Sequence, residues 1–397
     1  MKEPKIRFKG FQGEWEEKAL GCCVAFWDSM RQPIEEVKRI KGIYPYYGAS
    51  GVVDYINDYI FDEELILLSE DGANITDRNY PVCFIARGKY WVNNHAHVLK
   101  ANKGFDNVFL CNNLERKDYT QYNTGMAMPK LNKEVCIRIP VFYPILPEQQ
   151  SISSYFQHLD SLIQSTTKKI ESLKQVKAAS LQSMFPQEGE TTPRVRFKGF
   201  EGEWEKVLIG KMGVTYSGLS GKTKDDFGFG EARFITFLNV LTNAKIDTSI
   251  LEPVNVNRDE HQNEVRKGDL LFNTSSETPE EVGMCAVMDE ELEKVYLNSF
   301  CFGFRVTDNN IDPTCVAYMM RSHIGRLIMS ILAQGATRYN LSKNSFCKAV
   351  LVLPKNIAEQ RAIASYFTTL DSQITLQTQR LEKLKQIKSA CLDNMFV

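Results

Sequence analysis

The sequence predicts an α+β fold in which two mixed α/β domains are joined by two long antiparallel coiled-coil helices, arranged as an internal two-fold repeat. Three observations predict it. A short motif occurs twice, a long helical pattern occurs twice, and the segments between them contain short apolar runs typical of strands. Self-similarity within one chain indicates that one architecture is used twice.

The short motif is the clearest part of the repeat. PKIRFKGFQGEWE (4–16) returns as PRVRFKGFEGEWE (193–205), with ten of thirteen positions identical. Trp15 and Trp204 occupy the same place in both copies. Residues that do not differ between the copies serve what the copies share, so we assign both tryptophans to a common scaffold.

The long pattern predicts two helices. EQQSISSYFQHLDSLI (148–163) returns as EQRAIASYFTTLDSQI (359–374), and both copies continue into an LKQxKxxxLxxMF ending. Apolar residues recur at spacings of four and three, which is typical of a coiled coil. The predicted seam consists of Ile152, Phe156, Leu159, Ile163, Ile170 and Leu173 in the first helix, and of Ile363, Phe367, Leu370, Ile374, Leu381 and Leu384 in the second.

Polar residues interrupt both seams at matching places, Thr166 and Gln377. The matching breaks favour two helices that face each other. Packing of each helix only on its own domain is the alternative. A helix of 38 residues, such as 148–185, is ~57 Å long at ~1.5 Å per residue. This length is suited to a spacer.

The segments between the repeated motifs differ from one another. They share only a weak echo, GMAMPKLNK (125–133) beside GATRYNLSK (335–343). Apolar runs flanked by Gly, Asn and Asp predict strands at 64–69, 82–86, 269–274 and 301–306, and the spacing of apolar residues predicts one helix over 314–332. One architecture in which the segments between the repeated motifs diverge predicts two different specificities.

Composition limits the functional classes. Hydrophobic residues make up 43% of the chain, and no apolar stretch approaches the ~20 residues that span a bilayer, so we expect no membrane association. The start, MKEPKIRFKG, lacks the apolar stretch of a secretory signal, which favours a cytoplasmic protein. The ten cysteines show no C-x2-C spacing, so we expect thiols rather than a zinc site.

The repeated layout resembles the specificity (S) subunit of Type I restriction–modification systems. The FKGFxGEWE entries, the EQxxIxxYFxxLD helix starts and the LKQxKxxxLxxMF helix ends carry the resemblance over essentially the whole chain. The segments between the repeated motifs resemble two types of target-recognition domain. One type is carried by YPYYGASGVVDYINDYIFDEELILLSEDGAN (44–74) and WVNNHAHVL (91–99). SGLSGKTKDDFGFG (217–230), FITFLNVL (234–241) and VRKGDLLFNTSSETPEEVG (265–283) resemble another.

The resemblance implies a non-catalytic subunit that reads a bipartite site on double-stranded DNA and scaffolds two methyltransferase subunits and restriction (translocase) subunits. No cofactor is expected on this chain, because S-adenosylmethionine and ATP with Mg belong to those partners. The implied limits are 1–147 for the first target-recognition domain, 148–185 for the central spacer helix, 186–193 for a linker, 194–357 for the second target-recognition domain and 358–397 for the distal spacer helix.

The sequence lacks catalytic motifs, as the resemblance implies. It contains no NPPY-, NPPF- or DPPY-type tetrapeptide of adenine methylation. SGLSGKT approaches a phosphate-binding loop, but the first glycine of GxxxxGKT is replaced by Tyr216. Lys222, Thr223 and Lys224 instead suit a flexible loop against DNA phosphates, with a solvated turn as the alternative.

Several polar loops hold candidate DNA contacts. Asparagine can pair with adenine N6 and N7, and arginine can read guanine, which points to NNHAHV (93–98) and to the loops at 273–279 and 335–340. For Asn93, Asn94 and His95 the alternative is that they cap local turns, and for Arg338 and Tyr339 it is that they hold phosphate. His95 and His97 share a strand face, but no neighbouring Cys or carboxylate completes a metal site, so we expect none. The predicted contacts are Ser50, Asn93, Asn94, His95, Lys222, Thr223, Lys224, Asn273, Thr274, Ser275, Arg338 and Tyr339.

Two other functions remain open from the sequence. The chain could be a stand-alone bipartite DNA-binding or scaffold protein that regulates another restriction system, or an enzyme with a fused recognition domain. The charge balance weighs against strong DNA binding by the chain alone, because 48 Lys and Arg stand against 49 Asp and Glu, a net charge of −1. Phosphate binding requires either a concentrated basic face or help from partner subunits.

Overall fold

The computed structural model describes residues 2–257, 259–335 and 337–397, and it divides into two compact units. The first unit comprises Met1–Lys168 together with Thr378–Val397, and the second comprises Lys169–Gln377. Each unit therefore takes the beginning of one long helix and the end of the other. Within the described ranges, no helix is both long and apolar enough to cross a membrane.

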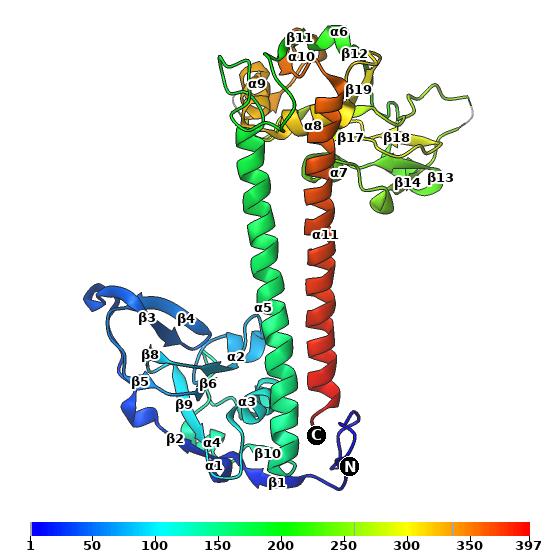
Figure 1. Ribbon diagram of the computed structural model, residues 1–397. Coiled ribbons are helices and arrows are strands. Elements are labelled where there is room, and N and C mark those ends of the chain that lie inside the picture. Colours follow the sequence, from blue (N-terminus) through cyan, green and yellow to red (C-terminus); the bar gives the residue numbers. More distant parts are fainter. Residues whose placement is uncertain (1, 258, 336) are drawn as a thin grey trace. The chain divides into compact units, whose positions relative to one another are not determined.

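The first unit contains two four-stranded sheets and one two-stranded ribbon (Figure 1). The central sheet is antiparallel, in the order β2-β9-β6-β7, and the second sheet has the order β4-β3-β8-β5. The ribbon pairs β1 with β10. The strands are β1 (Glu16–Ala19), β2 (Val24–Phe26), β3 (Lys41–Gly48), β4 (Gly51–Ile56), β5 (Phe61–Asp62), β6 (Leu65–Ser69), β7 (Cys83–Ala86), β8 (Lys89–Val92), β9 (Ala96–Ala101) and β10 (Pro140–Tyr143). The helices and 3-10 turns are α1 (Leu20–Cys23), η1 (Asp28–Met30), η2 (Glu36–Lys38), α2 (Asn74–Asp77), α3 (Asn107–Glu115), η3 (Thr120–Tyr122) and α4 (Lys133–Cys136).

The second unit repeats this plan with a different second sheet. Its antiparallel central sheet has the order β12-β19-β15-β17, and the other sheets are β14-β13-β18, β11-β21 and β16-β20. The strands are β11 (Glu205–Leu208), β12 (Gly213–Ser217), β13 (Phe227–Ile235), β14 (Glu252–Val254), β15 (Leu270–Asn273), β16 (Ser275–Ser276), β17 (Cys285–Val287), β18 (Val295–Leu297), β19 (Cys301–Val306), β20 (Tyr339–Asn340) and β21 (Val350–Leu353). The helices and 3-10 turns are α6 (Ile209–Met212), η4 (Lys224–Asp226), α7 (Phe237–Thr242), η5 (Thr248–Ile250), α8 (Pro313–Arg321), α9 (His323–Leu332) and α10 (Lys343–Cys347).

The four strands predicted from apolar runs are present as β6, β7, β15 and β19. The single helix predicted over 314–332 is wrong, because the chain forms two helices, α8 and α9, that meet at Ser322. Ser322 adopts an extended conformation, and its hydroxyl accepts a hydrogen bond from the backbone N–H of Gly325. Serine favours such N-cap positions over helix interiors, so a new helix begins there.

The two long helices are α5 (Leu146–Ser183) and α11 (Ile357–Asn394). In the first unit, Tyr155 Oη lies 3.4 Å from Cys391 Sγ, and Asp160 pairs with Lys388. In the second unit, Ser180 Oγ lies 2.9 Å from Tyr366 Oη, and Lys177 pairs with Asp371. Residue numbers rise along one helix as they fall along the other, so the helix segments are antiparallel within each unit.

The predicted seam positions differ in where they pack and in how deeply they are buried. Ile152, Phe156 and Leu159 lie in the core of the first unit, and Ile363, Phe367 and Leu370 lie in the core of the second. Leu173 packs at the edge of the second core and Leu384 at the edge of the first. Ile170 is buried, whereas Ile163, Ile374 and Leu381 are half-buried. The opening turns of each helix thus belong to a domain core as well as to the helix pair.

Both tryptophans of the repeated motif lie in these cores, which confirms the scaffold assignment. Trp15 makes an edge contact with Phe396, the last aromatic residue of α11's repeated ending, and Trp204 does the same with Phe185. Beside them, Arg7 binds Glu148 and Arg196 binds Glu359, each through two charge-assisted hydrogen bonds. The motif therefore attaches each domain to the start of its own long helix, through the arginine, and to the segment that follows the other long helix, through the tryptophan.

Candidate nucleic-acid interface

The central sheets of the two units end in the same arrangement of backbone hydrogen bonds, which is called the backbone frame below. Ser69 at the end of β6 pairs with Ala96, as Asn273 at the end of β15 pairs with Cys301. One residue further on, Glu70 N–H donates to His95 O at 2.9 Å, and Thr274 N–H donates to Phe300 O at 3.0 Å. Three chain segments consequently meet at equivalent ends of two sheets.

The third segment is the one that carries the echoed GxxxxxLxK motif. Leu131 N–H donates to Glu70 O at 2.7 Å, and Leu341 N–H donates to Thr274 O at 2.8 Å. Both leucines are buried. The weak sequence echo therefore marks one structural position in both units, although Ala336 of the second copy lies outside the described residues.

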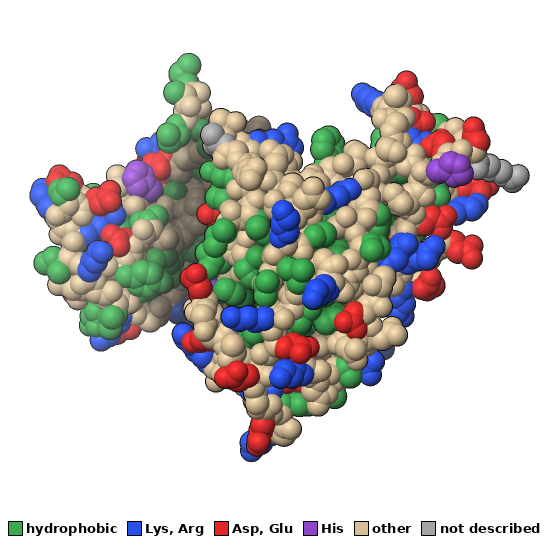
Figure 2. All heavy atoms as spheres, turned by 90° about the horizontal axis from the view of Figure 1, so that it is seen from above, with side chains coloured by type: hydrophobic (Ala, Val, Ile, Leu, Met, Phe, Trp, Pro, Cys, Tyr) green, Lys and Arg blue, Asp and Glu red, His purple; other side chains and the backbone are tan. Residues whose placement is uncertain are grey.

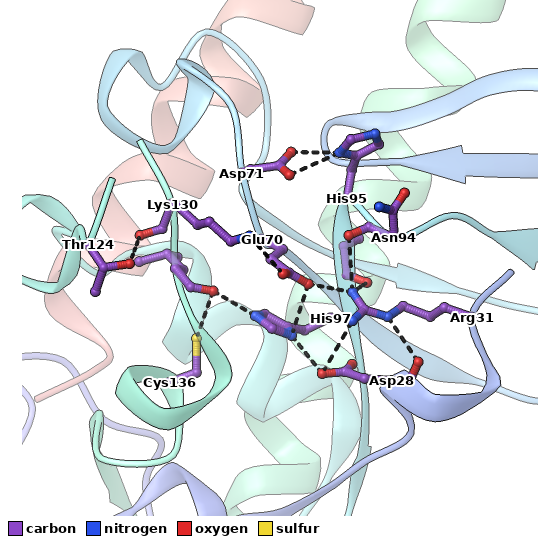
Figure 3. Close-up of polar contacts among 12 residues, drawn as sticks. Asp28, Arg31, Glu70, Asp71, Asn94, His95, His97, Thr124, Lys130 and Cys136 are labelled. Carbon is purple, nitrogen blue, oxygen red and sulfur yellow. Dashed lines mark hydrogen bonds and ion pairs between the residues drawn. The ribbon is translucent and has the colours of Figure 1, made fainter. Parts of the chain in front are cut away.

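In the first unit, half-buried polar side chains around the buried His97 support this end of the sheet (Figure 3). The ring of His97 lies 2.8 Å from Asp28 Oδ2 through Nδ1 and 2.7 Å from Leu131 O through Nε2. Arg31 donates to Glu70 at 2.6 Å and to the backbone oxygens of Asn94 and Ala96. The cluster joins η1, β6, β9 and the echoed segment.

The electrostatics of the cluster favour a protonated His97. Burial lowers its pKa, but hydrogen bonds and charges from Asp28 and Cys136 outweigh burial and raise the pKa to about 10. Both ring nitrogens face acceptors, and only the doubly protonated ring donates to both. Burial raises the pKa of Asp28, whereas its contacts with His97, Val98 and Arg31 lower it more, so its pKa falls below the usual range. His97 therefore belongs to a structural ion pair.

Of the predicted contacts in the first unit, three side chains are at the surface. Ser50 is exposed in the β3–β4 turn, which lies beside the sheet end because Ser69 Oγ donates to Ala49 O. Asn94 is exposed, and His95 is half exposed with its Nδ1 2.8 Å from Asp71. Asn93 is buried, and its side-chain oxygen accepts from His95 N–H, the local turn contact that was the alternative reading.

In the second unit, Arg338 and Tyr339 come from the echoed segment and lie next to the end of β15. Arg338 is exposed and donates through Nε to Ser275 Oγ at 3.2 Å, while Tyr339 pairs with Ser276 in the β16–β20 ribbon. Thr274 is half-buried and donates to Phe300 O at 2.6 Å. The structure brings these residues together at one sheet end, with Ser275 buried beneath Arg338.

Asn273 has a different role from the one predicted. It is fully buried, its Nδ2 donates to Ser275 O and Glu281 O, and its Oδ1 accepts from Met284 N–H at 2.6 Å. An amide engaged in this way holds the turn after β15. We therefore leave Asn273, and for the same reason Asn93, out of the proposed set of base contacts.

The glycine-rich loop of the second unit is more ordered than a flexible phosphate loop. The side chain of Lys222 is only 5% exposed and pairs with Glu260 at 2.6 Å. Thr223 and Asp226 form a capping box at the start of η4. The pairing with Lys222 and hydrogen bonds from Asn257 and Gln262 lower the pKa of Glu260 to about 2. Lys224 is exposed, so it is the side chain of this loop best placed for a phosphate.

Sequence reasoning missed three exposed side chains at the two sheet ends. Phe300 occupies the place that His95 has in the first unit and is 58% exposed. Met126 and Met128 project from the echoed segment of the first unit, where Met126 is fully exposed. For the two methionines the echo is the available signal, because it aligns their segment with the one that carries Arg338, whereas Phe300 lies outside the echo.

The structure also bears on metal ligation and on surface charge. Across 2–257, 259–335 and 337–397, no group of three or more His, Cys, Asp or Glu side chains is arranged to hold a metal ion. On the face of the molecule seen in Figure 2, basic and acidic side chains are interspersed rather than gathered by sign. This distribution agrees with the balanced net charge.

Comparison with known proteins gives the family. Residues 12–175 and 202–386 match the family described as the Type I restriction modification DNA specificity domain, which together is most of the chain. The chain belongs to this family. Its members are the non-catalytic, DNA-recognising subunits of type I restriction–modification systems, and they carry no cofactor of their own. The resemblance inferred from the repeated motifs is confirmed.

Individual relatives cover nearly the whole chain. A candidate type I restriction enzyme specificity subunit from Haemophilus influenzae is 25% identical over 374 residues, 92% of this chain and 90% of the relative. The Type I restriction enzyme MjaVIII specificity subunit of Methanocaldococcus jannaschii is 20% identical over 406 residues, 96% of this chain and 91% of its own. The crystal structure of a Type I S subunit from M. genitalium shares the fold, with a TM-score of 0.68 at 12% identity, covering 100% of this chain and 99% of that one.

Proposed function

We propose that this specificity subunit reads a bipartite site on double-stranded DNA, with one half-site for each unit. One observation carries the proposal: the two sheet ends share a backbone frame but present different side chains. His95 in one frame corresponds to Phe300 in the other, and the echoed segments differ in the same way. A constant frame with variable side chains is what two readers of different sequences require.

The proposed contacts are side chains that are at least partly exposed, together with Ser275, which is buried but binds the exposed Arg338. Ser50, Asn94 and His95 are the candidates in the first unit, and Lys224, Thr274, Ser275, Arg338 and Tyr339 are those in the second, with Lys222 and Thr223 shaping the loop around Lys224. Arginine favours guanine through paired contacts to O6 and N7, so Arg338 is the strongest base-reading candidate. Lysines at the edge are suited to phosphates.

The partners we propose are two methyltransferase subunits and restriction (translocase) subunits. Methyl transfer would use S-adenosylmethionine on the former, and DNA translocation would use ATP with Mg on the latter. Surfaces that the two repeats share, such as the motif around Trp15 and Trp204 and the outer faces of α5 and α11, are the natural docking sites for two copies of one partner. We place this assembly in the cytoplasm, where its DNA substrate and these cofactors occur.

The proposed division of labour follows the limits expected from the sequence. The variable segments, within 1–147 and 194–357, would read DNA. The segment 186–193 would link the two halves of the chain, and the helices 148–185 and 358–397 would set the distance between half-sites. The two compact units cut across these limits because each contains parts of both helices. An exchange of reading domains must therefore leave both helices intact.

The test is to express the chain with its methyltransferase partner and map methylated adenines on genomic DNA. We expect one bipartite sequence with two fixed halves and a spacer of constant length. A chain that binds two DNA segments but never associates with a methyltransferase would support a stand-alone regulator instead. Methyl transfer by the chain alone would show that it is an enzyme.

A further inference from the structure

The segment Thr124–Leu131 is a hairpin with a rigid stem. Thr124 N–H donates to Lys130 O at 2.8 Å, and the side-chain oxygen of Asn123 accepts from the N–H groups of both Gly125 and Lys130 at 2.9 Å. Gly72 N–H, in the loop after β6, donates to Pro129 O at 3.0 Å. These bonds fix the stem to the end of the central sheet.

The tight bend at the base of the hairpin requires glycine. A Cβ added to Gly125 would lie 1.8 Å from Met128 O. The second unit has the same arrangement, because Gln334 and Asn340 exchange two backbone hydrogen bonds and a Cβ on Gly335 would lie 2.0 Å from Arg338 O. Two equivalent stems therefore carry different tips.

The tip of the first hairpin is apolar and stands in solvent. Met126 is fully exposed and Met128 is 61% exposed, while Thr124 and Lys130 are joined by a backbone hydrogen bond at the base beneath them. The tip is also continuous with the candidate interface. Lys130 at its base pairs with Glu70 and forms a bridge with Asp71, which in turn contacts His95 (Figure 3). In the second unit, the corresponding tip presents Arg338, a proposed base contact.

We infer that this hairpin is a DNA-contacting element of the first unit, and that Met126 and Met128 rest against the bases of its half-site. The inference rests on the proposed function and adds residues that the sequence did not suggest. Methionine can contact the methyl groups and faces of bases but cannot bind a phosphate. The contact therefore contributes to recognition of the first half-site and leaves the electrostatic part of binding unchanged.

The experiment uses the complete chain assembled with its methyltransferase partner and a duplex that contains the mapped site. The variant is Met126→Ser with Met128→Ser. Loss of a base contact weakens specific binding on the order of tenfold. We expect that loss together with relaxed methylation of the first half-site, an unchanged second half-site and an unchanged slope of log affinity against log salt. The matched control is Val37→Ser with Ile43→Ser, two other strongly exposed apolar residues of the same unit, which should bind as the unaltered chain does.

Three results would overturn the inference. The first is a double variant that keeps its affinity within twofold and its first half-site intact. The second is a changed salt slope, which would indicate a phosphate contact. The third is loss of association with the methyltransferase, which would show that the tip binds protein. Failure of the unaltered complex to methylate any defined sequence would instead refute the proposed function itself, before the variants are compared.

Discussion

Arg7 holds the carboxylate of Glu148, 141 positions further along the chain, through two hydrogen bonds of 2.7 Å each. Glu148 is only 1% exposed, so Arg7→Ala leaves a buried charge without its cation. Removal of one partner of a buried pair costs roughly 3–5 kcal/mol. We expect Arg7→Ala to lower the free energy of unfolding of the first unit by about that amount, as measured by hydrogen exchange of β6 and β9.

The equivalent substitution in the second unit serves as an internal control. Glu359 keeps a second donor there, because Trp204 Nε1 lies 3.3 Å from its carboxylate, whereas Trp15 Nε1 has no partner among the described residues. Arg196→Ala should therefore destabilise the second unit less than Arg7→Ala destabilises the first. Equal losses would mean that the indole contact contributes nothing.

Exchange of one reading domain should alter one half-site. Residues 206–357 lie between Trp204 and Glu359, so their replacement by another recognition domain keeps the scaffold contacts of the second unit. We expect the second half of the methylated sequence to change and the first to stay the same, as read by methylation mapping. A simultaneous change of both halves would refute separate readers.

The chain alone should bind DNA weakly. Its net charge is −1, and affinity for DNA depends on the number of phosphates that basic side chains neutralise. A salt titration of binding by the isolated chain should give a shallow slope, and addition of the methyltransferase should steepen it. Nanomolar binding with a steep slope by this subunit alone would contradict the idea that partners provide most of the phosphate contacts.

The stability of the first unit should depend on pH through His97. Its pKa is about 10 in the folded protein and about 6.5 in an unfolded chain, so the native state binds the extra proton. The stabilisation is complete below pH 6.5 and is lost as the pH rises toward 10, at no more than about 1.4 kcal/mol per pH unit. The unfolding temperatures of the unaltered chain and of His97→Gln should therefore approach each other as the pH rises from 7 to 10. The matched control is His158→Gln, which removes an exposed imidazole outside this cluster.

Lengthening of a long helix should lengthen the gap between half-sites. Four residues inserted after Ser165, beside the polar break at Thr166, add ~6 Å of helix at ~1.5 Å per residue. At ~3.4 Å of duplex per base pair, this corresponds to one or two additional spacer base pairs. The insertion also unwinds the coil locally, so part of the activity should be lost. Methylation mapping should show unchanged halves and a longer spacer; an active variant with the original spacer would show that these helices do not set the distance.

Buried strands and repeated motifs could be predicted from the sequence because burial and duplication both leave regular patterns. The runs that became β6 and β19 are apolar and end in turn residues, and the repeated motif placed Trp15 and Trp204 correctly. The helix over 314–332 could not be divided by periodicity, since Ser322 fits a helical pattern as well as it fits a cap.

The site was harder to predict because the same polar residues serve turns and ligands. Asn273 follows an apolar strand and looked like a base contact, but its amide satisfies three backbone groups of the turn. Met126 was missed for the opposite reason, since an apolar residue in a loop is usually buried. In both cases, tertiary hydrogen bonds that no local pattern encodes decided which side chains reach solvent.

The reciprocal exchange of helix ends carries an evolutionary consequence. Tyr155 meets Cys391 as Tyr366 meets Ser180, so each half of the chain offers the surface that completes the other. A half-length ancestor would have completed itself by pairing with its own copy, and such a pair would have recognised a palindrome. Fusion of two such copies would free the two halves to diverge. Under the proposed function, recombination within one variable segment would then change one half of the target, because the surfaces that pair the helices lie outside the exchanged segment.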